Sequence, residues 1–266
     1  MNTSSRTLPN DDSSAANVIA DHFDHCFRTF FASEDSLKTP QCFRMVTREP
    51  HPIGNIAVFS REATPADVTR EATPLCEDGF PAAIVFLGSG APEQLAAASA
   101  LGFCPAESMP LMSVTPGALA PTSLPDGYTL REVSESEASA WARAVSTGYG
   151  LPLPVGSLLG VDRAAARCPG KARHHAVEQG GRMVATSLVY LHDGLAGIYG
   201  VATLPEHRGK GLAAHLTAEP LRAAWDLGYT AGLLQASEMG APVYERIGFR
   251  THGHIPLLVR PSAAAT

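Results

Sequence analysis

The sequence has no apolar run long enough to cross a membrane, and it is poor in basic residues. No stretch reaches the ~18 uninterrupted apolar residues of a transmembrane helix. Lys and Arg number 20 against 26 Asp and Glu, and the net charge is −6. A protein that binds nucleic acid would instead gather positive charge on one face. Residues 1–12 also lack the basic and apolar blocks of a signal peptide. We therefore predict neither nucleic acid nor membrane as a partner.

Cysteine is scarce, and its spacing excludes two common uses of this residue. The chain holds five cysteines, an odd number, and none of them forms a C-x-x-C pair. A disulfide framework or a zinc knuckle needs paired or closely spaced cysteines. The pattern fits reduced thiols, and we predict a cytoplasmic protein. The five residues are Cys26, Cys42, Cys76, Cys104 and Cys168.

Histidine spacing predicts no metal site. The tripeptide at 252–254 places two imidazoles on one strand face, but no third ligand accompanies them. His22, His25 and Cys26 follow one another at helical spacing. We interpret these three as the exposed face of a helix.

The first half of the chain reads as a mixture of helix and strand. Hydrophobic residues make up 45% of the chain, which is typical of a globular protein, and 266 residues favour two domains. Apolar spacing predicts a helix over residues 14–33 and strands over 55–60 and 82–88. Between these strands the sequence Arg-Glu-Ala-Thr-Pro occurs twice, at 61–65 and 70–74, and its prolines predict a loop.

A proline-rich stretch separates the two halves. Residues 115–127 hold three prolines among small residues, which is linker composition. We therefore predict four segments: a disordered tail at 1–14, a first domain at 15–120, a linker at 121–126 and a second domain at 127–262.

The second half alternates strands and helices. Ser134-x-x-Glu137 has capping-box spacing and predicts the start of a helix. A helix is predicted from Leu212 onward, with Gly228 at its C-terminal end and Pro220 as a kink or break. The predicted strands cover residues 128–133, 174–179, 183–191, 196–203, 231–236 and 255–259.

Two short patterns recur at a distance of one domain. The tripeptides at 101–103 and 109–111 (L-G-F and M-P-L) have the same spacing as those at 247–249 and 255–257 (I-G-F and I-P-L). An internal duplication explains this better than coincidence. The first half has no glycine-rich loop to match that of the second, so we predict that it lacks cofactor chemistry.

The run Arg208-Gly209-Lys210-Gly211 follows a predicted strand and precedes a helix. Glycines allow close approach of the backbone to a ligand, and successive N–H groups at a helix N-terminus attract anions. Arg and Lys add cationic donors. The run therefore suits a diphosphate, although it matches neither a Walker A loop nor the three-glycine Rossmann pattern.

This run resembles the R/Q-x-x-G-x-G/A signature of the GNAT superfamily of N-acyltransferases, through Arg208, Gly211 and Ala213. Residues 200–205 resemble the family's fourth strand and its exit, and 237–249 resemble its short helix ending in Y-x-x-x-G-F. The resemblance implies an α/β (α+β) fold of tandem GNAT-like units, each a mixed, mostly antiparallel sheet flanked by helices.

The resemblance also implies acetyl-CoA as co-substrate and assigns roles to individual residues. Backbone groups of the fourth strand would pair with the pantetheine arm, and an N–H near Val201 would face the thioester oxygen. Tyr244 matches the tyrosine that protonates the departing thiolate. The residues implied in cofactor binding are Val201, Ala202, Thr203, Arg208, Gly209, Lys210, Gly211, Leu212, Ala213 and Ser237.

Two positions depart from the family pattern. Ser237 stands where the family often has an asparagine, and residues 195–199 hold no carboxylate, although many members carry a glutamate base there. The base is then Glu238, which we rank first, a histidine such as His175, or a water chain. Alternatively, the amine arrives deprotonated.

We predict an N-acetyltransferase that acts on an amine of a small molecule or peptide, as a monomer or homodimer. The alternative is a non-catalytic acyl-CoA-binding regulatory module. A phosphate-binding hydrolase or kinase is a weaker rival, because no Walker lysine or metal-binding carboxylate pattern is present. Acceptor specificity is expected from residues 134–166, from the loop after Arg250 and from the first half.

Overall fold

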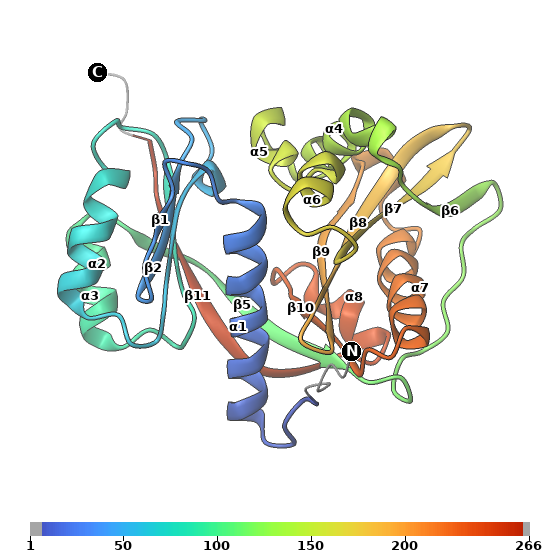
Figure 1. Cartoon of the computed structure of the whole chain (residues 1–266), viewed down its shortest axis with the longest axis horizontal. Coiled ribbons are helices and arrows are strands. Elements are labelled where there is room, and N and C mark those ends of the chain that lie inside the picture. The colour runs from blue at the N-terminus through green and yellow to red at the C-terminus, as the bar shows by residue number, and fades with distance from the viewer. Residues whose placement is uncertain (1–6, 263–266) are drawn as a thin grey trace.

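A computed structural model describes residues 7–262, in which eleven strands form one continuous sheet (Figure 1). The sheet order is β1-β2-β3-β4-β11-β5-β10-β9-β8-β7-β6. The strands are β1 (Leu37–Lys38), β2 (Cys42–Val46), β3 (Asn55–Phe59), β4 (Ala82–Phe86), β5 (Cys104–Val114), β6 (Tyr128–Glu132), β7 (Ala172–Gln179), β8 (Arg182–His192), β9 (Leu195–Thr203), β10 (Ala231–Gln235) and β11 (Arg250–Arg260).

Helices cover both faces of the sheet. In the second half, α4 and α7 lie on opposite faces of β8: Leu188 packs with Trp141 of α4, whereas its neighbour Val189 packs in the cluster that contains Leu221 of α7. The long helix α1 crosses the middle of the sheet, close to the boundary between the halves (Figure 1). The helices are α1 (Asp12–Phe30), α2 (Pro65–Ala72), α3 (Pro92–Ala100), α4 (Ala138–Tyr149), α5 (Leu153–Ser157), α6 (Val161–Arg167), α7 (Leu212–Asp226) and α8 (Ala241–Arg246).

The two halves exchange their last strands. β11, at the end of the second half, pairs with β4 of the first half, and β5, at the end of the first half, pairs with β10 of the second. β5 and β11 also pair with each other in antiparallel fashion, with Ile255 opposite Met109. The fold is therefore tandem and GNAT-like, but its two sheets are merged into one.

The duplicated Gly-Phe turns have the same backbone hydrogen bonds. Phe103 N–H donates to the Ala98 carbonyl at 3.2 Å, and Phe249 N–H donates to the Tyr244 carbonyl at 3.0 Å. Gly102 and Gly248 have φ values of +85° and +101°, which only glycine adopts at low cost. Each turn ends a helix and leads into an exchanged strand, so the sequence repeat marks equivalent positions in the two halves.

The predicted loop between β3 and β4 is wrong in its central part. Residues Pro65–Ala72 form the helix α2, because Thr64 caps its N-terminus and Pro65 occupies the first turn. Proline removes no hydrogen bond at that position, so the residue that predicted a loop in fact starts a helix. The second proline, Pro74, lies in the 3₁₀ turn that follows.

Pro220 does not split α7, which runs unbroken from Leu212 to Asp226. A proline inside a helix leaves the carbonyl four residues earlier without its partner. Here that carbonyl belongs to Leu216, and the buried hydroxyl of Ser187 on β8 donates to it at 2.9 Å. A neighbouring strand thus supplies the missing hydrogen bond, and the predicted break does not occur.

Most other expected elements of the second half are confirmed. Gly180 and Gly181 join β7 to β8, and Asp193 and Gly194 join β8 to β9, all with positive φ. Residues 115–127 contain no helix or strand. They lie against α7 and the end of α8, where Ala120 accepts a bond from Arg222 at 2.8 Å.

Only residues 7–14 of the predicted N-terminal tail lie in the described part of the chain. Residues 1–6 lie outside the described part of the chain, and α1 already begins at Asp12, capped by the side chain of Asp11. The prediction that His22 and Cys26 lie on an exposed helix face is wrong. Both side chains are buried against the second half. Within residues 7–262 no helix is long and apolar enough to cross a membrane.

Candidate active site

β9 and β10 separate in the middle of the sheet. They pair in parallel only from Leu195 to Gly197 of β9, and residues 198–203 have no partner on β10. The other edge of β9 stays paired with β8 as far as Thr203. The result is a strand with one open backbone edge inside a sheet, and an open edge of this kind accepts an extended ligand by strand addition.

A bulge reorients the backbone at this edge. The β8–β9 register shifts between Leu188–Tyr199 and Thr186–Ala202, and Gly200 adopts φ +58°. A Cβ at Gly200 would come within 3.3 Å of the Trp141 ring, so glycine serves both the conformation and the packing. The bulge places the Val201 amide outside the regular ladder.

The glycine-rich loop leads from β9 into α7 and leaves the helix N-terminus open. Gly209 and Gly211 have φ values of +74° and +77°, and Gly211 is the N-cap without any side-chain cap bond. No heavy atom lies within 4 Å of a Cβ built at either glycine. The space above both residues is therefore free, and the uncapped N–H groups after Gly211, with the positive end of α7, suit an anion.

The two basic side chains of this loop have partners within the protein. Arg208 donates to the Gly148 carbonyl at 2.8 Å and to the Thr203 carbonyl at 3.2 Å, and so ties the end of α4 to the end of β9. Lys210 donates to the Tyr128 hydroxyl at 2.8 Å. In this structure the loop offers an anion its backbone, while Arg208 shapes the site.

Tyr244 lies on α8, on the far side of the gap between β9 and β10. Its ring packs against Phe249 with centroids 5.8 Å apart. Burial raises the pKa of the Tyr244 phenol well above its usual range, and the neighbouring Tyr149 phenol adds to the shift. Tyr244 is therefore protonated at neutral pH, as a proton donor must be.

Ser237 and Glu238 lie at the surface in the turn that follows β10. The Ser237 hydroxyl accepts from the Gly240 amide at 3.1 Å, so it stabilises the turn that leads into α8. The Glu238 amide donates to the Glu107 carboxylate at 2.7 Å. The Glu238 carboxylate borders a surface cavity of about 650 Å³ that Glu245 and His254 also line.

His175 is not brought to the site. It lies on β7, which β8 separates from β9, and it is buried. Burial lowers the pKa of His175 to about 4, so the imidazole is neutral at pH 7.

Tyr149, which the sequence analysis did not single out, belongs to the site. It is the last residue of α4, next to Gly148, whose backbone lies directly against Ala202 and Thr203 of β9. Burial of this hydroxyl raises the pKa of Tyr149 to about 12, although half of the residue's surface is exposed. No motif marks this tyrosine; the only local signal is Gly150, which ends the helix with φ +72°.

Among the described residues of the first half, the strands show no equivalent opening. β3 and β4 pair from Ile56 to Phe59, and the Leu87 amide extends the pairing by donating to the Phe59 carbonyl at 2.9 Å. The strands therefore do not separate where β9 and β10 do.

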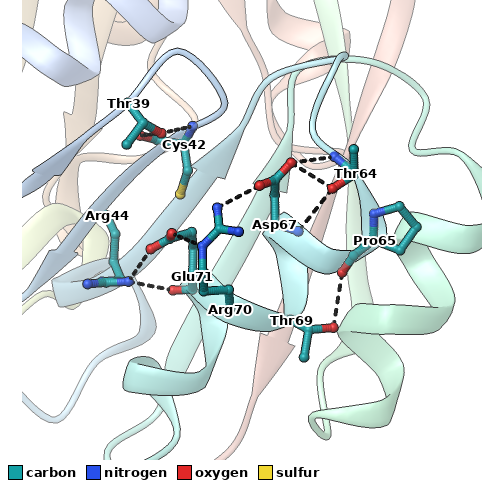
Figure 2. Close-up of polar contacts among 9 residues, drawn as sticks. All are labelled: Thr39, Cys42, Arg44, Thr64, Pro65, Asp67, Thr69, Arg70 and Glu71. Atoms are coloured by element: carbon teal, nitrogen blue, oxygen red, sulfur yellow. Dashed lines mark hydrogen bonds and ion pairs between the residues drawn. The ribbon is translucent and has the colours of Figure 1, made fainter.

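The helix that follows β3 is also closed to anions. The Thr64 hydroxyl accepts from the Asp67 amide at 3.1 Å, and the Asp67 carboxylate accepts from the Thr64 amide at 2.9 Å (Figure 2). Arg70 pairs with the same carboxylate at 2.6 Å. The amides that would face a phosphate are thus occupied, and a negative charge stands beside them.

Comparisons with known proteins agree with this geometry. Residues 129–252 match the family described as Acetyltransferase (GNAT) domain. An uncharacterized N-acetyltransferase of Streptomyces avermitilis is 30% identical over 141 residues, which cover 50% of this chain and 33% of that protein. One from Streptomyces griseus is 34% identical over 136 residues, 45% of this chain and 30% of that protein.

Solved structures share the fold over nearly the whole chain. A GCN5-related N-acetyltransferase from Kribbella flavida has a TM-score of 0.63 at 20% identity and covers 93% of this chain and 97% of its own. One from Sphaerobacter thermophilus has a TM-score of 0.61 at 16% identity, covering 97% and 98%. A tandem GNAT protein from the clavulanic acid biosynthesis pathway has a TM-score of 0.55 at 13% identity, covering 99% and 92%.

Residues 129–252, just under half of the chain, thus match the GNAT acetyltransferase family. The solved structures extend the shared fold to the first half. The matched segment spans only about a third of the curated relatives.

Proposed function

We propose that the chain transfers an acetyl group from acetyl-CoA to an amine of a small molecule or peptide, in the gap between β9 and β10. The observation that carries the proposal is the open edge of β9, which leads directly into the uncapped N-terminus of α7. Acetyl-CoA has the matching shape: an extended pantetheine arm with amides, followed by a diphosphate.

The residues fit the cofactor in order along the chain. The backbone of Val201, Ala202 and Thr203 would pair with the pantetheine amides. The amides of the loop from Arg208 to Ala213 would hold the diphosphate, because both glycines leave free space above the backbone. Ser237 lies at the opposite side of the gap, where its hydroxyl can meet the pantetheine arm.

The chemistry needs one donor for the developing oxyanion and one for the leaving thiolate. The Val201 N–H, freed from the ladder by the bulge, would stabilise negative charge on the thioester oxygen as the amine nitrogen attacks the carbonyl carbon. The C–S bond then breaks, and Tyr244 would protonate the thiolate sulfur. The proton lost by the amine leaves to Glu238, in the turn after β10, or to water, because β9 itself carries no carboxylate.

The acceptor would enter beside α4 and α5. Two of the four large apolar side chains that are exposed among residues 7–262, Tyr149 and Leu153, lie there. An amine that carries an apolar group would cover them. Only the second half would bind coenzyme A, since the strands of the first half stay paired and its helix α2 is self-capped.

A direct test is stabilisation by acetyl-CoA, with Gly211→Val as the matched variant. We expect acetyl-CoA to raise the melting temperature of the wild type. In Gly211→Val the Kd should rise at least about a hundredfold, because a branched Cβ opposes positive φ and fills the space over the loop. Gly127→Val, another positive-φ glycine with open space, is the control for strain alone.

The alternative function, a non-catalytic acyl-CoA-binding module, gives a different result. An enzyme and a binding module would both bind acetyl-CoA, but only an enzyme would release free CoA thiol when amines of a panel are added. Near-normal acetyl-CoA affinity in Gly211→Val would remove the glycine-rich loop from the proposal.

A further inference from the structure

An imidazole from the first half of the chain lies against β9, the strand that carries no carboxylate. A Cβ built on Gly197 would lie 2.5 Å from Cε1 and 2.8 Å from Nδ1 of His22, which belongs to α1. No side chain fits at Gly197, because the His22 ring already fills the space that it would take. Gly197 is also the last residue of β9 that pairs with β10, so His22 lies where the gap between these strands begins.

Tyr199 connects this imidazole with the gap. It lies two residues beyond the last β9–β10 pair, and its side chain is partly exposed. The Tyr199 hydroxyl lies 2.9 Å from the His22 Nδ1, and the two rings are stacked with centroids 6.2 Å apart. α1 and α4 pack into the same core cluster, so the contact lies on the face of the sheet from which the acceptor would enter.

The second ring nitrogen of His22 has no use in the folded structure alone. Nε2 is buried and has no hydrogen-bond partner among residues 7–262, and such an atom calls for a functional explanation. His22 also lines a cavity of about 300 Å³ where α1 meets the turn between β8 and β9. This cavity offers a proton on the ring a route to solvent. The other titratable or charged residues that line it are Asp21, Asp24, His25, Arg28, His192 and Asp193.

We propose that Tyr199 and His22 form a proton relay, which takes a proton from the ammonium form of the acceptor and delivers it to solvent. This inference rests on the proposed function. The ammonium group gives one N–H proton to the Tyr199 oxygen, while the Tyr199 hydroxyl proton moves to the His22 Nδ1. The resulting imidazolium loses a proton to water in the cavity. The neutral amine nitrogen then attacks the thioester carbon.

Burial suits both groups to passing a proton on rather than keeping it. It raises the pKa of the Tyr199 phenol well above its usual range, so the hydroxyl proton is present at neutral pH. It lowers the pKa of His22 to about 3, and the His192 and His25 imidazoles add to this shift. An imidazolium at this position is therefore short-lived, and His22 returns to its neutral form.

The test compares benzylamine, which is protonated at neutral pH, with aniline, which is neutral. Turnover of each amine with acetyl-CoA is measured for the full chain as wild type, Tyr199→Phe and Tyr190→Phe. Tyr190 is the matched control, because its hydroxyl lies 2.9 Å from the Nδ1 of His25, also on α1, but belongs to β8.

In Tyr199→Phe we expect turnover of benzylamine at pH 7 to fall at least about a hundredfold, the loss of a proton-transfer group, while turnover of aniline is unchanged. Turnover of benzylamine should recover as the pH rises, because the amine then arrives without its extra proton. Tyr190→Phe should retain the wild-type ratio of the two rates. The relay would be overturned by an unchanged benzylamine rate in Tyr199→Phe, by an equal loss with aniline, or by the same loss in Tyr190→Phe.

A second measurement judges the relay without acceptor or cofactor. The relay requires a His22 Nδ1 without a proton, so that it accepts from the Tyr199 hydroxyl. Side-chain ¹⁵N NMR of the unliganded protein distinguishes the two imidazole tautomers, and the His22 signals are those lost in His22→Gln. We expect the proton on Nε2, and a proton on Nδ1 would overturn the relay. A wild type that neither binds acetyl-CoA nor acetylates an amine would overturn the proposed function, and the tautomer would still decide whether Tyr199 can pass its proton to His22.

Discussion

Tyr244 is the side chain on which the proposed chemistry depends most directly. In Tyr244→Phe, turnover should fall roughly 10²- to 10⁴-fold, the usual loss for a removed proton donor. The Michaelis constant for acetyl-CoA should change little, because the hydroxyl acts as the thiolate departs. Single-turnover rates measure the loss of turnover, and melting temperatures of the same preparations show whether the variant is still folded.

The second phenol at the site provides a control for this prediction. If the single variant Tyr244→Phe keeps its turnover but the double variant with Tyr149→Phe loses turnover, then Tyr149 supplies the proton. If both keep it, the thiolate is protonated by water. A hydroxyl that only satisfied a buried hydrogen bond would cost about 1 kcal/mol of stability and spare turnover.

Among the residues of the candidate site, the sequence predicts those that belong to a motif and misses those that tertiary packing brings there. The loop glycines carry a pattern whose physical requirement, positive φ and open space, the structure bears out at Gly209 and Gly211. Tyr149 carries no pattern, since its position depends on the contact between Gly148 and Ala202. A contact between α4 and β9 cannot be read from either segment alone.

Helix α1 belongs to the first half of the chain but packs its imidazoles against the second. The His22 Nδ1 lies 2.9 Å from the Tyr199 hydroxyl, and the His25 ring stacks on His192 with centroids 3.6 Å apart. Burial lowers the pKa of His22 to about 3 and that of His25 to about 4, and the neighbouring imidazoles add to both shifts. The docking of α1 therefore requires neutral histidines.

This predicts a loss of stability in mild acid. Both pKa values lie below the ~6.5 of an unfolded histidine, so below that pH the unfolded chain binds more protons than the folded one. The free energy of unfolding should fall as the pH drops from about 6.5 toward 4. Urea unfolding at several pH values should show a shallower fall for His22→Gln than for the wild type. His254 is exposed, so His254→Gln should show the same pH dependence of the unfolding free energy as the wild type. The same dependence in all three proteins would contradict the role of His22.

Elements marked by local backbone chemistry could be predicted, and elements decided by tertiary partners could not. The Gly180-Gly181 and Asp193-Gly194 pairs favour the positive φ values of tight hairpin turns, so both hairpins could be predicted. The effect of Pro220 depends on Ser187, which comes from another strand. For α2, the prolines of the repeat predict a loop, but Pro65 stands in the first turn, where proline favours a helix.

For the whole molecule, the exchange of β5 and β11 makes each half depend on the other. A fragment of residues 123–266 lacks β5, which lies between β10 and β11 and supplies Met112 and Val114 to the core beneath α7. We expect this fragment to aggregate or to unfold without a cooperative transition. Co-expression with residues 1–122 should restore a soluble complex that elutes together on size exclusion and melts cooperatively. A fragment that is monomeric, cooperative and binds acetyl-CoA alone would contradict this expectation.

The tandem architecture could be inferred from the repeated Gly-Phe and Met-Pro or Ile-Pro patterns, but the exchange could not. The two strands have similar sequences and the same preceding turn, so pairing within a half or across halves looks equally good locally. The choice depends on how both sheets meet, which is a property of the complete fold.

The same exchange has a consequence for how the protein is made. β4 and β5 are synthesised well before β11, which must insert between them. Until residues 250–260 leave the ribosome, both strands present bare backbone edges, and such edges pair readily with other chains. The sheet can therefore close between β4 and β5 only once β11 is available, and until then the growing chain is open to edge-to-edge pairing with other chains.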